Sequence, residues 1–291
     1  GPDAGGVARG VRSGAGAGPG GAGLALCGSG YTLPFGEGYT LEPMPEVKLV
    51  GMDFGRFVAC GLDASGGPHC AWSTDRDDRS YYYEASPAGP FTTVATAYGA
   101  ACGLTPAGEI QCWGKDRYLS SAGGEYFDPP PPEGVYTALD LGVDVGCAIA
   151  QDGSLACWGG LHRGRSHGSV PEGEFVAVSV ESEAACAIRA TGETVCWPLV
   201  EDLYYETTLQ PPDVALASLS TCYDFTCGLD FEGQVWCWGG LSGGEVVAPA
   251  TRFRNISVGP IVSCGVTLDD TLGCWDLRDG SLLGYGEVAC D

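Results

Sequence analysis

The stretch CAIAQDGSLACWGG (147–160) decides the fold, because its two cysteines have a spacing that recurs along the chain. Cys-x9-Cys occurs six times, and the first cysteines of successive copies lie 37 to 45 residues apart. A fixed internal spacing on a regular outer period indicates one supersecondary unit repeated around or along an axis. The six pairs are Cys60/Cys70, Cys102/Cys112, Cys147/Cys157, Cys186/Cys196, Cys227/Cys237 and Cys264/Cys274.

Further positions repeat when the first cysteine of each copy is numbered 0. Every copy has a proline at −15, an aromatic residue or leucine at −11, and an apolar residue at −8 and at +2. Five copies carry glycine at +6, namely Gly66, Gly108, Gly153, Gly192 and Gly233, and the sixth carries Asp270. Tryptophan follows the second cysteine in five copies, as Trp113, Trp158, Trp197, Trp238 and Trp275, while Trp72 is displaced by one residue.

These positions predict a disulfide-clipped β-hairpin in each copy. Residues +4 to +6 form a three-residue loop whose last residue is left-handed, which glycine accepts without steric cost. The cysteines then face each other across an antiparallel pair, at the close, non-hydrogen-bonded site. Positions 0, 2, 8 and 10 share one face and form a buried stripe, and the tryptophan points to the opposite face.

Zinc is the alternative use of paired cysteines, but zinc sites favour shorter Cys-x2-Cys or Cys/His spacings. We therefore predict six local disulfides. We also predict a Cys27–Cys290 bond that joins the two ends, with Leu282 at −8 of an abbreviated seventh copy. Cys222 remains as a free thiol; a small buried thiol is the simple interpretation, and mispairing with an end cysteine or an intermolecular bond is the other.

The repeat predicts one domain rather than two. Residues 21–291 are covered by it and form a seven-bladed, all-β propeller, whereas residues 1–20 are rich in Gly and Ala and are expected to be a flexible tail. Gly1-Pro2 fits the remnant of a cleaved tag. The sequence has no apolar run of membrane-spanning length and no signal peptide, yet its disulfides require an oxidising compartment. We expect a mature exported chain that has lost its leader and is secreted, periplasmic or at the cell surface.

The net charge of −23 bears on the partners that the chain can take. Such a surface repels nucleic acid and anionic membranes at long range and suits cations or a basic partner. The cluster of Asp75, Asp77 and Asp78 is either a solvated loop or a calcium ligand set, although it lacks the spacing and the glycine of an EF-hand loop.

The unit Cys-[Gly/Ala]-aliphatic-x3-Gly-x-aliphatic-x-Cys-Trp-Gly resembles the repeat of the regulator of chromosome condensation (RCC1-like) family, most clearly in 147–160 and in CGLDFEGQVWCWGG (227–240). The resemblance spans nearly the whole chain and implies a seven-bladed β-propeller. The nuclear founder of the family is a nucleotide exchange factor for a small GTPase and binds chromatin, which this acidic chain without a basic tail does not match. A secreted bacterial relative by fold inhibits β-lactamase through aromatic-rich loops, and the resemblance to it implies an exported binder.

Other patterns carry little chemistry. Gly240-Leu-Ser242-Gly-Gly244 spells a hydrolase elbow but follows a propeller strand, and the glycines of 18–23 match a dinucleotide fingerprint by spelling alone. The three histidines, His69, His162 and His167, fall on two copies, which disfavours a metal or triad site. Asn255-Ile-Ser257 is a glycosylation sequon on a predicted strand. We assign no catalytic residue, no metal and no cofactor.

Aromatic residues outside the repeat register give the better functional signal. They fall in the connections that follow the Cys-Trp hairpins, and amphipathic aromatics on loops of a rigid scaffold are typical of binding hot spots. The alternative is that they form outer strands and pack against neighbouring blades. The candidate binding residues are Tyr81, Tyr82, Tyr83, Tyr118, Tyr126, Phe127, Tyr204 and Tyr205.

The sequence thus predicts a non-enzymatic, monomeric binding module that takes a protein, or a glycan, through aromatic and acidic connection loops on one face. A carbohydrate-active enzyme or glycan-binding propeller with carboxylates in its central channel is the second hypothesis, because 37 acidic residues allow many spatial pairs. A structural, surface-display module is the third.

Overall fold

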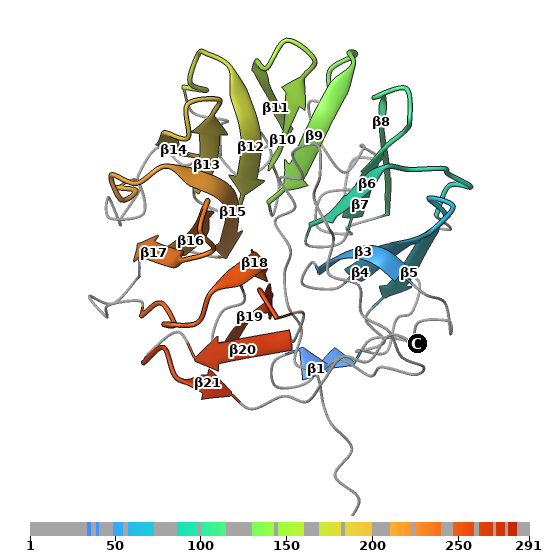
Figure 1. The fold of residues 1–291 in the computed structure, drawn as a ribbon. Helices are drawn as coiled ribbons and strands as arrows, with labels where there is room; N and C mark the ends of the chain where they lie inside the picture. The colour runs from blue at the N-terminus through green and yellow to red at the C-terminus, as the bar shows by residue number, and fades with distance from the viewer. Residues whose placement is uncertain are drawn as a thin grey trace, which may run out of the picture.

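A computed structural model describes residues 34–35, 39–40, 49–54, 58–72, 86–97, 100–114, 130–142, 145–159, 169–181, 184–199, 210–222, 225–239, 247–258, 262–269, 272–276 and 279–283. Within these ranges every regular element is a β-strand, and no helix there is long and apolar enough to cross a membrane. The strands form small antiparallel sheets placed around a common centre (Figure 1). The predicted all-β class is confirmed.

Each copy of the repeat supplies three consecutive strands to one sheet, and we number the copies one to six. The first strands, nearest the centre in Figure 1, are β3 (Leu49–Phe54), β6 (Thr93–Thr96), β9 (Tyr136–Leu141), β12 (Phe175–Val180), β15 (Leu216–Cys222) and β18 (Phe253–Ser257). The middle strands are β4 (Val58–Asp63), β7 (Ala100–Leu104), β10 (Val145–Ala150), β13 (Ala184–Arg189), β16 (Phe225–Asp230) and β19 (Val262–Thr267). The outer strands are β5 (Pro68–Trp72), β8 (Ile110–Gly114), β11 (Leu155–Gly159), β14 (Thr194–Pro198), β17 (Val235–Gly239) and β20 (Leu272–Asp276).

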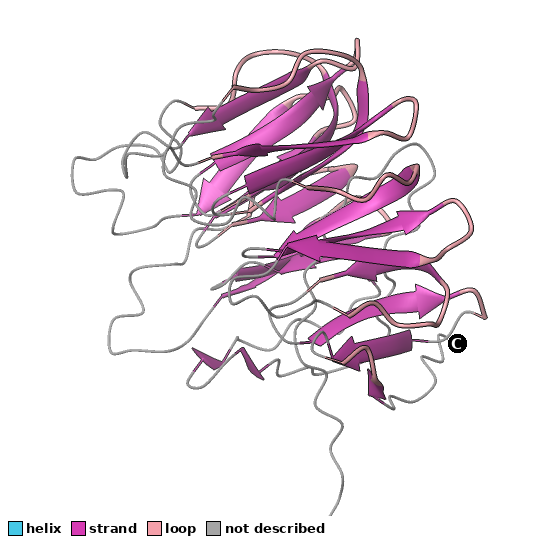
Figure 2. Cartoon of the chain, turned by 90° about the vertical axis from the view of Figure 1, so that its left-hand side faces the viewer, coloured by secondary structure: helices cyan, strands magenta, loops and turns pink. Residues whose placement is uncertain are grey.

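The hairpin between the middle and outer strands has the predicted register. In copy three, Cys147 lies opposite Cys157, Ala148 opposite Ala156, and Ile149 opposite Leu155. The glycine at +6 is left-handed in each of the five copies that have it, with φ between 82° and 89°. The hairpin loops gather on one side of the molecule, which we call the hairpin end (Figure 2).

Five of the predicted disulfides are present: Cys60–Cys70, Cys102–Cys112, Cys147–Cys157, Cys186–Cys196 and Cys227–Cys237. Their Cα atoms lie 4.0 to 4.1 Å apart, as the close cross-strand site requires. Cys274 is also disulfide-bonded and lies opposite Cys264 in the register of β19 and β20. The predicted Cys27–Cys290 bond falls outside the described residues.

The first strand has an irregularity that the sequence did not predict. In copies one, three, four, five and six, the pairing skips the residue at −10, so that a β-bulge separates −11 from −9. A bulge re-aims neighbouring side chains. The residues at −10 with described side chains are exposed, whereas the −11 residues Tyr136, Phe175, Leu216 and Phe253 are buried.

The core is built between copies rather than within them. Cys147 and Ile149, on the disulfide face of copy three, pack with Phe175 and Trp197 on the opposite face of copy four. The same combination recurs between each pair of successive copies from one to six, and we call it the seam. Both faces of a sheet are covered in this way, so the tryptophans that follow the second cysteine of copies two to six are buried although they point away from the disulfide.

In copies two, five and six, glycine at position +1 makes room for the residue at −11. A Cβ atom on Gly103 would lie 2.6 Å from Cδ1 of Phe91, and one on Gly228 would lie 2.6 Å from Cδ1 of Leu216. In these copies the −11 side chain therefore lies against the middle strand of its own copy, and in copies two and six its ring also packs against the tryptophan. In copy two, the rings of Phe91 and Trp113 are stacked with their centroids 5.3 Å apart.

Two series of hydrogen bonds reinforce the seams. At the hairpin end, the carbonyl of the +6 glycine accepts from the amide at −11 of the next copy. The five bonds of this series, 2.8 to 3.0 Å long, are Phe91 to Gly66, Tyr136 to Gly108, Phe175 to Gly153, Leu216 to Gly192, and Phe253 to Gly233. The turn glycine is thus needed twice, for its conformation and for the close approach of the next copy.

The second series lies on the inner strands, where the polar residue at −7 accepts from the amide at −6 of the next copy. The bonds run from Thr96 to Asp53 Oδ2, from Val180 to Asp140 Oδ2, from Thr221 to Ser179 Oγ, and from Val258 to Ser220 Oγ. These acceptors are buried. A buried amide needs a partner, so the polar residues hold neighbouring inner strands together.

Copy two breaks this pattern because Ala95 occupies position −7 and has no acceptor atom. The amide of Leu141, at −6 of copy three, instead donates to Oδ1 of its own neighbour Asp140 at 2.9 Å. Asp140 therefore serves two amides, one with each oxygen, and an aspartate is required where copies four to six have serine.

The end of the array corrects one expectation. The repeat register predicts Leu282 at −8 of a seventh copy, but it lies in β21 (Leu282–Leu283), a fourth strand that pairs with β20 opposite Trp275. The chain reverses through Gly280, whose φ is 70°, and the amide of Asp276 donates to the carbonyl of Ser281. This segment therefore covers the edge of β20. A further two-stranded sheet, β1 (Pro34–Phe35) with β2 (Tyr39–Thr40), was not predicted.

The repeat offers a matched test of the glycine carbonyl contacts. Gly153→Ala and Gly233→Ala introduce the same left-handed strain, at φ of 85° and 82°. The new Cβ meets the Glu174 side chain in the first variant but overlaps the Phe253 carbonyl oxygen in the second. We expect Gly153→Ala to lower the free energy of unfolding by about 1–2 kcal/mol and Gly233→Ala by at least about 1 kcal/mol more. Urea unfolding of the oxidised proteins measures both, and equal losses would contradict the close approach.

A double-mutant cycle tests the two roles of Asp140. Asp140→Ser keeps an acceptor for Val180 but leaves the buried Leu141 amide without one, so we expect a loss of about 1–3 kcal/mol. Ala95→Ser supplies the missing acceptor from copy two, and the double variant should regain about 1 kcal/mol of that loss. Additive effects of the two substitutions in urea unfolding would show that Ala95 and Asp140 do not share the Leu141 amide.

Candidate functional site

The eight aromatic residues chosen from the sequence all lie outside the described residues, as do Asp75, Asp77, Asp78, His162 and His167. The role of these aromatics in binding thus stays a prediction. Cys222 ends β15 opposite Phe225, which places its backbone beside the turn into β16. Asn255 lies on β18 as predicted, and its Oδ1 accepts from the amide of Val266 at 3.0 Å.

Large apolar side chains that reach solvent identify a different candidate surface. Among the described residues, the most exposed is Phe231, with 75% of its surface accessible, at the tip of the copy-five hairpin. Leu268 is 51% exposed at the corresponding position of copy six, and Trp236 is 37% exposed on β17. We call Phe231, Trp236 and Leu268 the hairpin patch.

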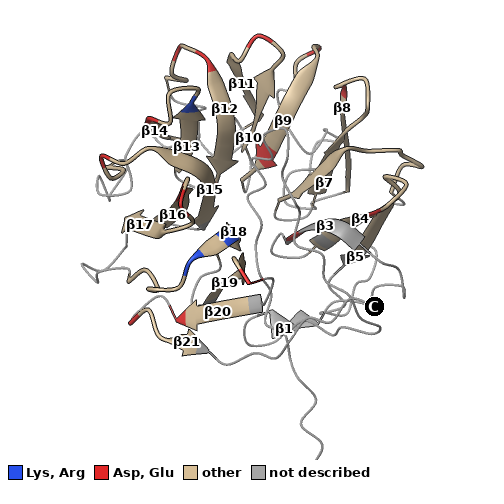
Figure 3. Cartoon of the chain, viewed as in Figure 1, with Lys and Arg blue, Asp and Glu red and all other residues tan. Residues whose placement is uncertain are grey.

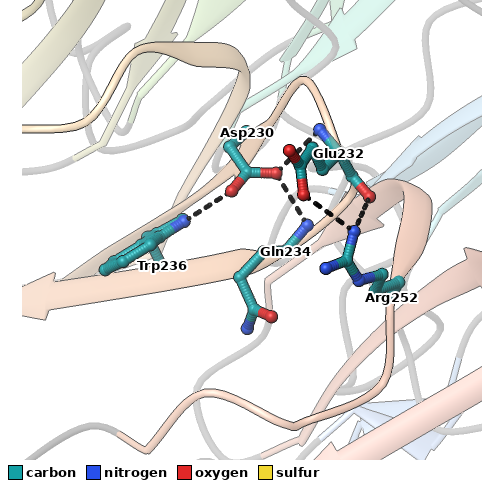
Figure 4. A network of polar contacts seen from close by, with 5 residues as sticks. All are labelled: Asp230, Glu232, Gln234, Trp236 and Arg252. Carbon is teal, nitrogen blue, oxygen red and sulfur yellow. Dashed lines mark hydrogen bonds and ion pairs between the residues drawn. The ribbon is translucent and has the colours of Figure 1, made fainter.

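Hydrogen bonds fix the side of the patch that belongs to copy five (Figure 4). Oδ1 of Asp230 accepts from the amides of Glu232 and Gln234, both at 2.9 Å, and thereby holds the loop that carries Phe231. Its other oxygen accepts from Nε1 of Trp236 at 3.1 Å. The indole is thus held beside the loop, although more than a third of it remains open to solvent.

Arg252 joins the two hairpins. Its Nη1 donates to the carbonyl of Glu232 and to Oε2 of the same residue, both at 3.1 Å, and its carbonyl accepts from the amide of Leu268 at 3.3 Å. Nη2 of Arg254, the bulge residue of copy six, reaches the Leu268 carbonyl at 3.4 Å. The loops of copies five and six are therefore neighbours, and Phe231 and Leu268 belong to one surface.

The sequence contains a signal for this patch that the search for surplus aromatics overlooked. Phe231 and Leu268 occupy position +4, the first residue of the hairpin loop, where the other copies have Ala64, Pro106, Gln151 and Ala190. Because +4 lies in a solvent-exposed turn in every copy, a phenylalanine there cannot serve the core. The unusual residue type at +4 in copies five and six is visible when the six copies are compared position by position.

The hairpin aspartates are held ionised by their loops. In copy one, hydrogen bonds from Ser65, His69 and Gly67 lower the pKa of Asp63 well below its usual range, and His69 Nε2 lies 2.9 Å from its carboxylate. In copy five, partial burial acts to raise the pKa of Asp230, but the bonds from Trp236, Gln234 and Glu232 outweigh it and lower that pKa. These two carboxylates therefore stay ionised in mild acid.

The inner-strand carboxylates bear on the hypothesis of catalysis in a central channel. Burial, with a contribution from the charge of Asp53, raises the pKa of Asp140 to about 8, and hydrogen bonds from Val180, Leu141 and Ser179 oppose the shift. A raised carboxyl pKa is a mark of catalytic acids. Here, however, Oδ1 of Asp140 accepts from the amide of Leu141 in its own copy and Oδ2 accepts from the amide of Val180 across the seam. The carboxylate of Asp53 accepts from the amide and the hydroxyl of Thr96. These two acids serve the structure.

Comparison with known proteins supports the fold. No protein-family model and no curated protein matches the chain. Solved structures that resemble it include the ectodomain of the Physcomitrella patens receptor kinase CR4, at 21% identity and a TM-score of 0.61, over 85% of this chain and 64% of that one. The CRINKLY WD40 ectodomain of the Arabidopsis thaliana receptor kinase ACR4 is 19% identical with a TM-score of 0.61, over 82% of this chain and 84% of that one.

The regulator of chromosome condensation itself is among these similar structures. Prp20p of Saccharomyces cerevisiae, the yeast RCC1, is 16% identical with a TM-score of 0.60, over 79% of this chain and 72% of its own. The chain therefore has the fold of the RCC1-like β-propellers, as its repeat implies. At these identities the likeness is one of fold.

The raised pKa of Asp140 predicts a specific pH dependence. Between the pKa of an unfolded aspartate, about 4, and that of Asp140, the folded state keeps a proton that the unfolded state has lost. This carboxyl therefore stabilises the fold in mild acid, and its contribution declines as the pH rises to about 8.

The variant Ala95→Ser/Asp140→Ser removes the titrating group while keeping acceptors for both amides, and it serves as the reference. We expect the difference in unfolding free energy between wild type and this variant to fall from about pH 5 to about pH 8. Parallel pH profiles in urea unfolding would show that Asp140 is ionised throughout.

Proposed function

We propose that this chain is a non-enzymatic, exported binding module whose seven-bladed propeller presents connection loops to a protein partner. The observation that carries the proposal is the composition of the five seams. In the described residues each seam is filled by residues of the repeat register, and in the sequence the aromatic residues of the connections fall outside that register. Aromatic side chains on a rigid scaffold bind at low entropic cost.

Likeness in fold supports the use of such a propeller as a scaffold for other proteins. Prp20p is described with its binding to Gsp1p and to histones, and it has been crystallised bound to Kap60. Two further similar structures are ectodomains of receptor kinases, which agrees with an oxidising, extracellular location for a chain with five disulfides in its described part.

The seventh blade is part of this proposal. Ser257 occupies position −7 of copy six, where the equivalent Ser179 and Ser220 each accept an amide from the following copy. Its hydroxyl is buried and makes no hydrogen bond in the described structure. A further copy after copy six, built from the two chain ends and joined by Cys27–Cys290, would supply that amide. Because Leu282 pairs with β20 in copy six, it is not part of the inner strand of this copy.

The connection loops are tested by a variant that carries alanine at Tyr81, Tyr82, Tyr83, Tyr204 and Tyr205. We expect wild-type, oxidised bait to capture a partner from extracellular and surface fractions of the source organism, and the variant to lose it with little change in melting temperature. The fold of the variant is checked by circular dichroism. Val135→Ser, an exposed substitution in a different segment, is the matched control and should retain the partner.

Two results would overturn the proposal. Retention of the partner by the five-tyrosine variant would exclude these loops as the binding site. Turnover of a polysaccharide by wild type, lost on substitution of acidic residues other than Asp53 and Asp140, would favour the carbohydrate-active alternative.

A further inference from the structure

The hairpin end of the sheets is strongly acidic. Nine exposed carboxylates lie in the hairpin loops or in the segments that enter the inner strands beside them: Glu109, Glu133, Asp152, Glu172, Glu174, Glu193, Asp213, Glu232 and Asp269. Figure 3 shows acidic residues on successive loops around the ring. The potential at this end therefore attracts cations at long range.

The three arginines of the described residues lie at this end and offset only part of the field, because the nine exposed carboxylates outnumber them. Arg189 donates to the Glu172 carbonyl at 3.0 Å and lies 3.4 Å from the carboxylate of Glu193. Arg252 is paired with Glu232, and Arg254 reaches the carbonyl of Leu268. Each arginine thus links loop segments to one another, and the remaining carboxylates face solvent.

The hairpin patch lies within this acidic end. Phe231 and Leu268 project from adjacent loop tips whose backbones are connected through Arg252, and Glu232 and Asp269 follow them directly in the chain. The indole of Trp236 is held at the side by Asp230. An exposed aromatic cluster on a hydrogen-bonded support, with a charged rim, has the composition of an interface hot spot.

We propose that the hairpin patch binds a basic segment of a partner protein that carries an apolar side chain between its lysines or arginines. The apolar side chain packs against Phe231 and Leu268, while the cations pair at the rim with Asp269 and with Oε1 of Glu232, whose Oε2 pairs with Arg252. Charge complementarity selects this occupant, because a net charge of −23 repels acidic proteins, nucleic acid and anionic membranes.

This inference rests on the proposed function, since it assumes a protein-binding module, but it uses none of the eight aromatic residues of the connections. The two sets of variants therefore separate the ideas. Loss of the captured partner in the five-tyrosine variant bears on the connection loops, whereas the patch is tested with variants of the hairpins.

The test is a selection from a random peptide library displayed on phage against the oxidised full chain. We expect the enriched peptides to combine lysine or arginine with leucine, phenylalanine or tryptophan, and to bind less tightly as salt is raised. The variant Phe231→Ser/Leu268→Ser should bind a synthetic copy of the best peptide about tenfold or more less tightly than wild type does. The variant Glu232→Gln/Asp269→Asn should lose less peptide affinity, and its peptide binding should depend less on salt.

Val135→Ser is the matched control, because Val135 is also on the hairpin end and is 49% exposed, close to the exposure of Leu268. It should leave peptide affinity unchanged, and thermal melts should show that all variants remain folded. The proposal is overturned if no peptide is enriched, if the enriched peptides lack basic residues, or if Phe231→Ser/Leu268→Ser and Val135→Ser bind the peptide equally well.

Discussion

The seam between successive copies is the contact on which the rest of this structure depends. A single sheet of three short strands has two apolar faces and cannot bury either alone. Each disulfide face is covered by the tryptophan and the −11 residue of the next copy, as Phe91 and Trp113 cover copy one. Hydrogen bonds at both ends of the inner strand then set the separation of the sheets, through the glycine carbonyl on one side and the −7 acceptor on the other.

The sequence predicted those features that are set by local chemistry and repeated in every copy. Cysteine spacing and the left-handed glycine determine the hairpin register, and Cys147 does lie opposite Cys157. The bulge at −10 could not be predicted, because the residues there, such as Thr137 and Arg254, include no glycine that would mark a bulge. The inner hydrogen-bond series was equally hidden, since Asp140 and Ala95 become partners only when two copies pack together.

The candidate binding residues also fall into two groups, those outside the repeat register and those inside it. The eight aromatic residues outside the register all lie beyond the described residues. The residues that it does bring to the surface, Phe231 and Leu268, are inside the register and differ from their equivalents in type alone. Because the seams supply the stability, loop tips are free to vary, and an unusual side chain at a repeated loop position is informative about recognition.

Native-state hydrogen exchange tests the central claim, that the seams unite the copies into one cooperative body. The amides of Thr96, Val180, Thr221 and Val258 donate between copies, whereas that of Ala148 lies within one sheet. The account predicts that these inter-copy amides exchange only through global unfolding, with the same free energy as the best protected amides of the middle strands. Faster exchange at all four, with the sheets still protected, would show that the copies separate on their own and would contradict it.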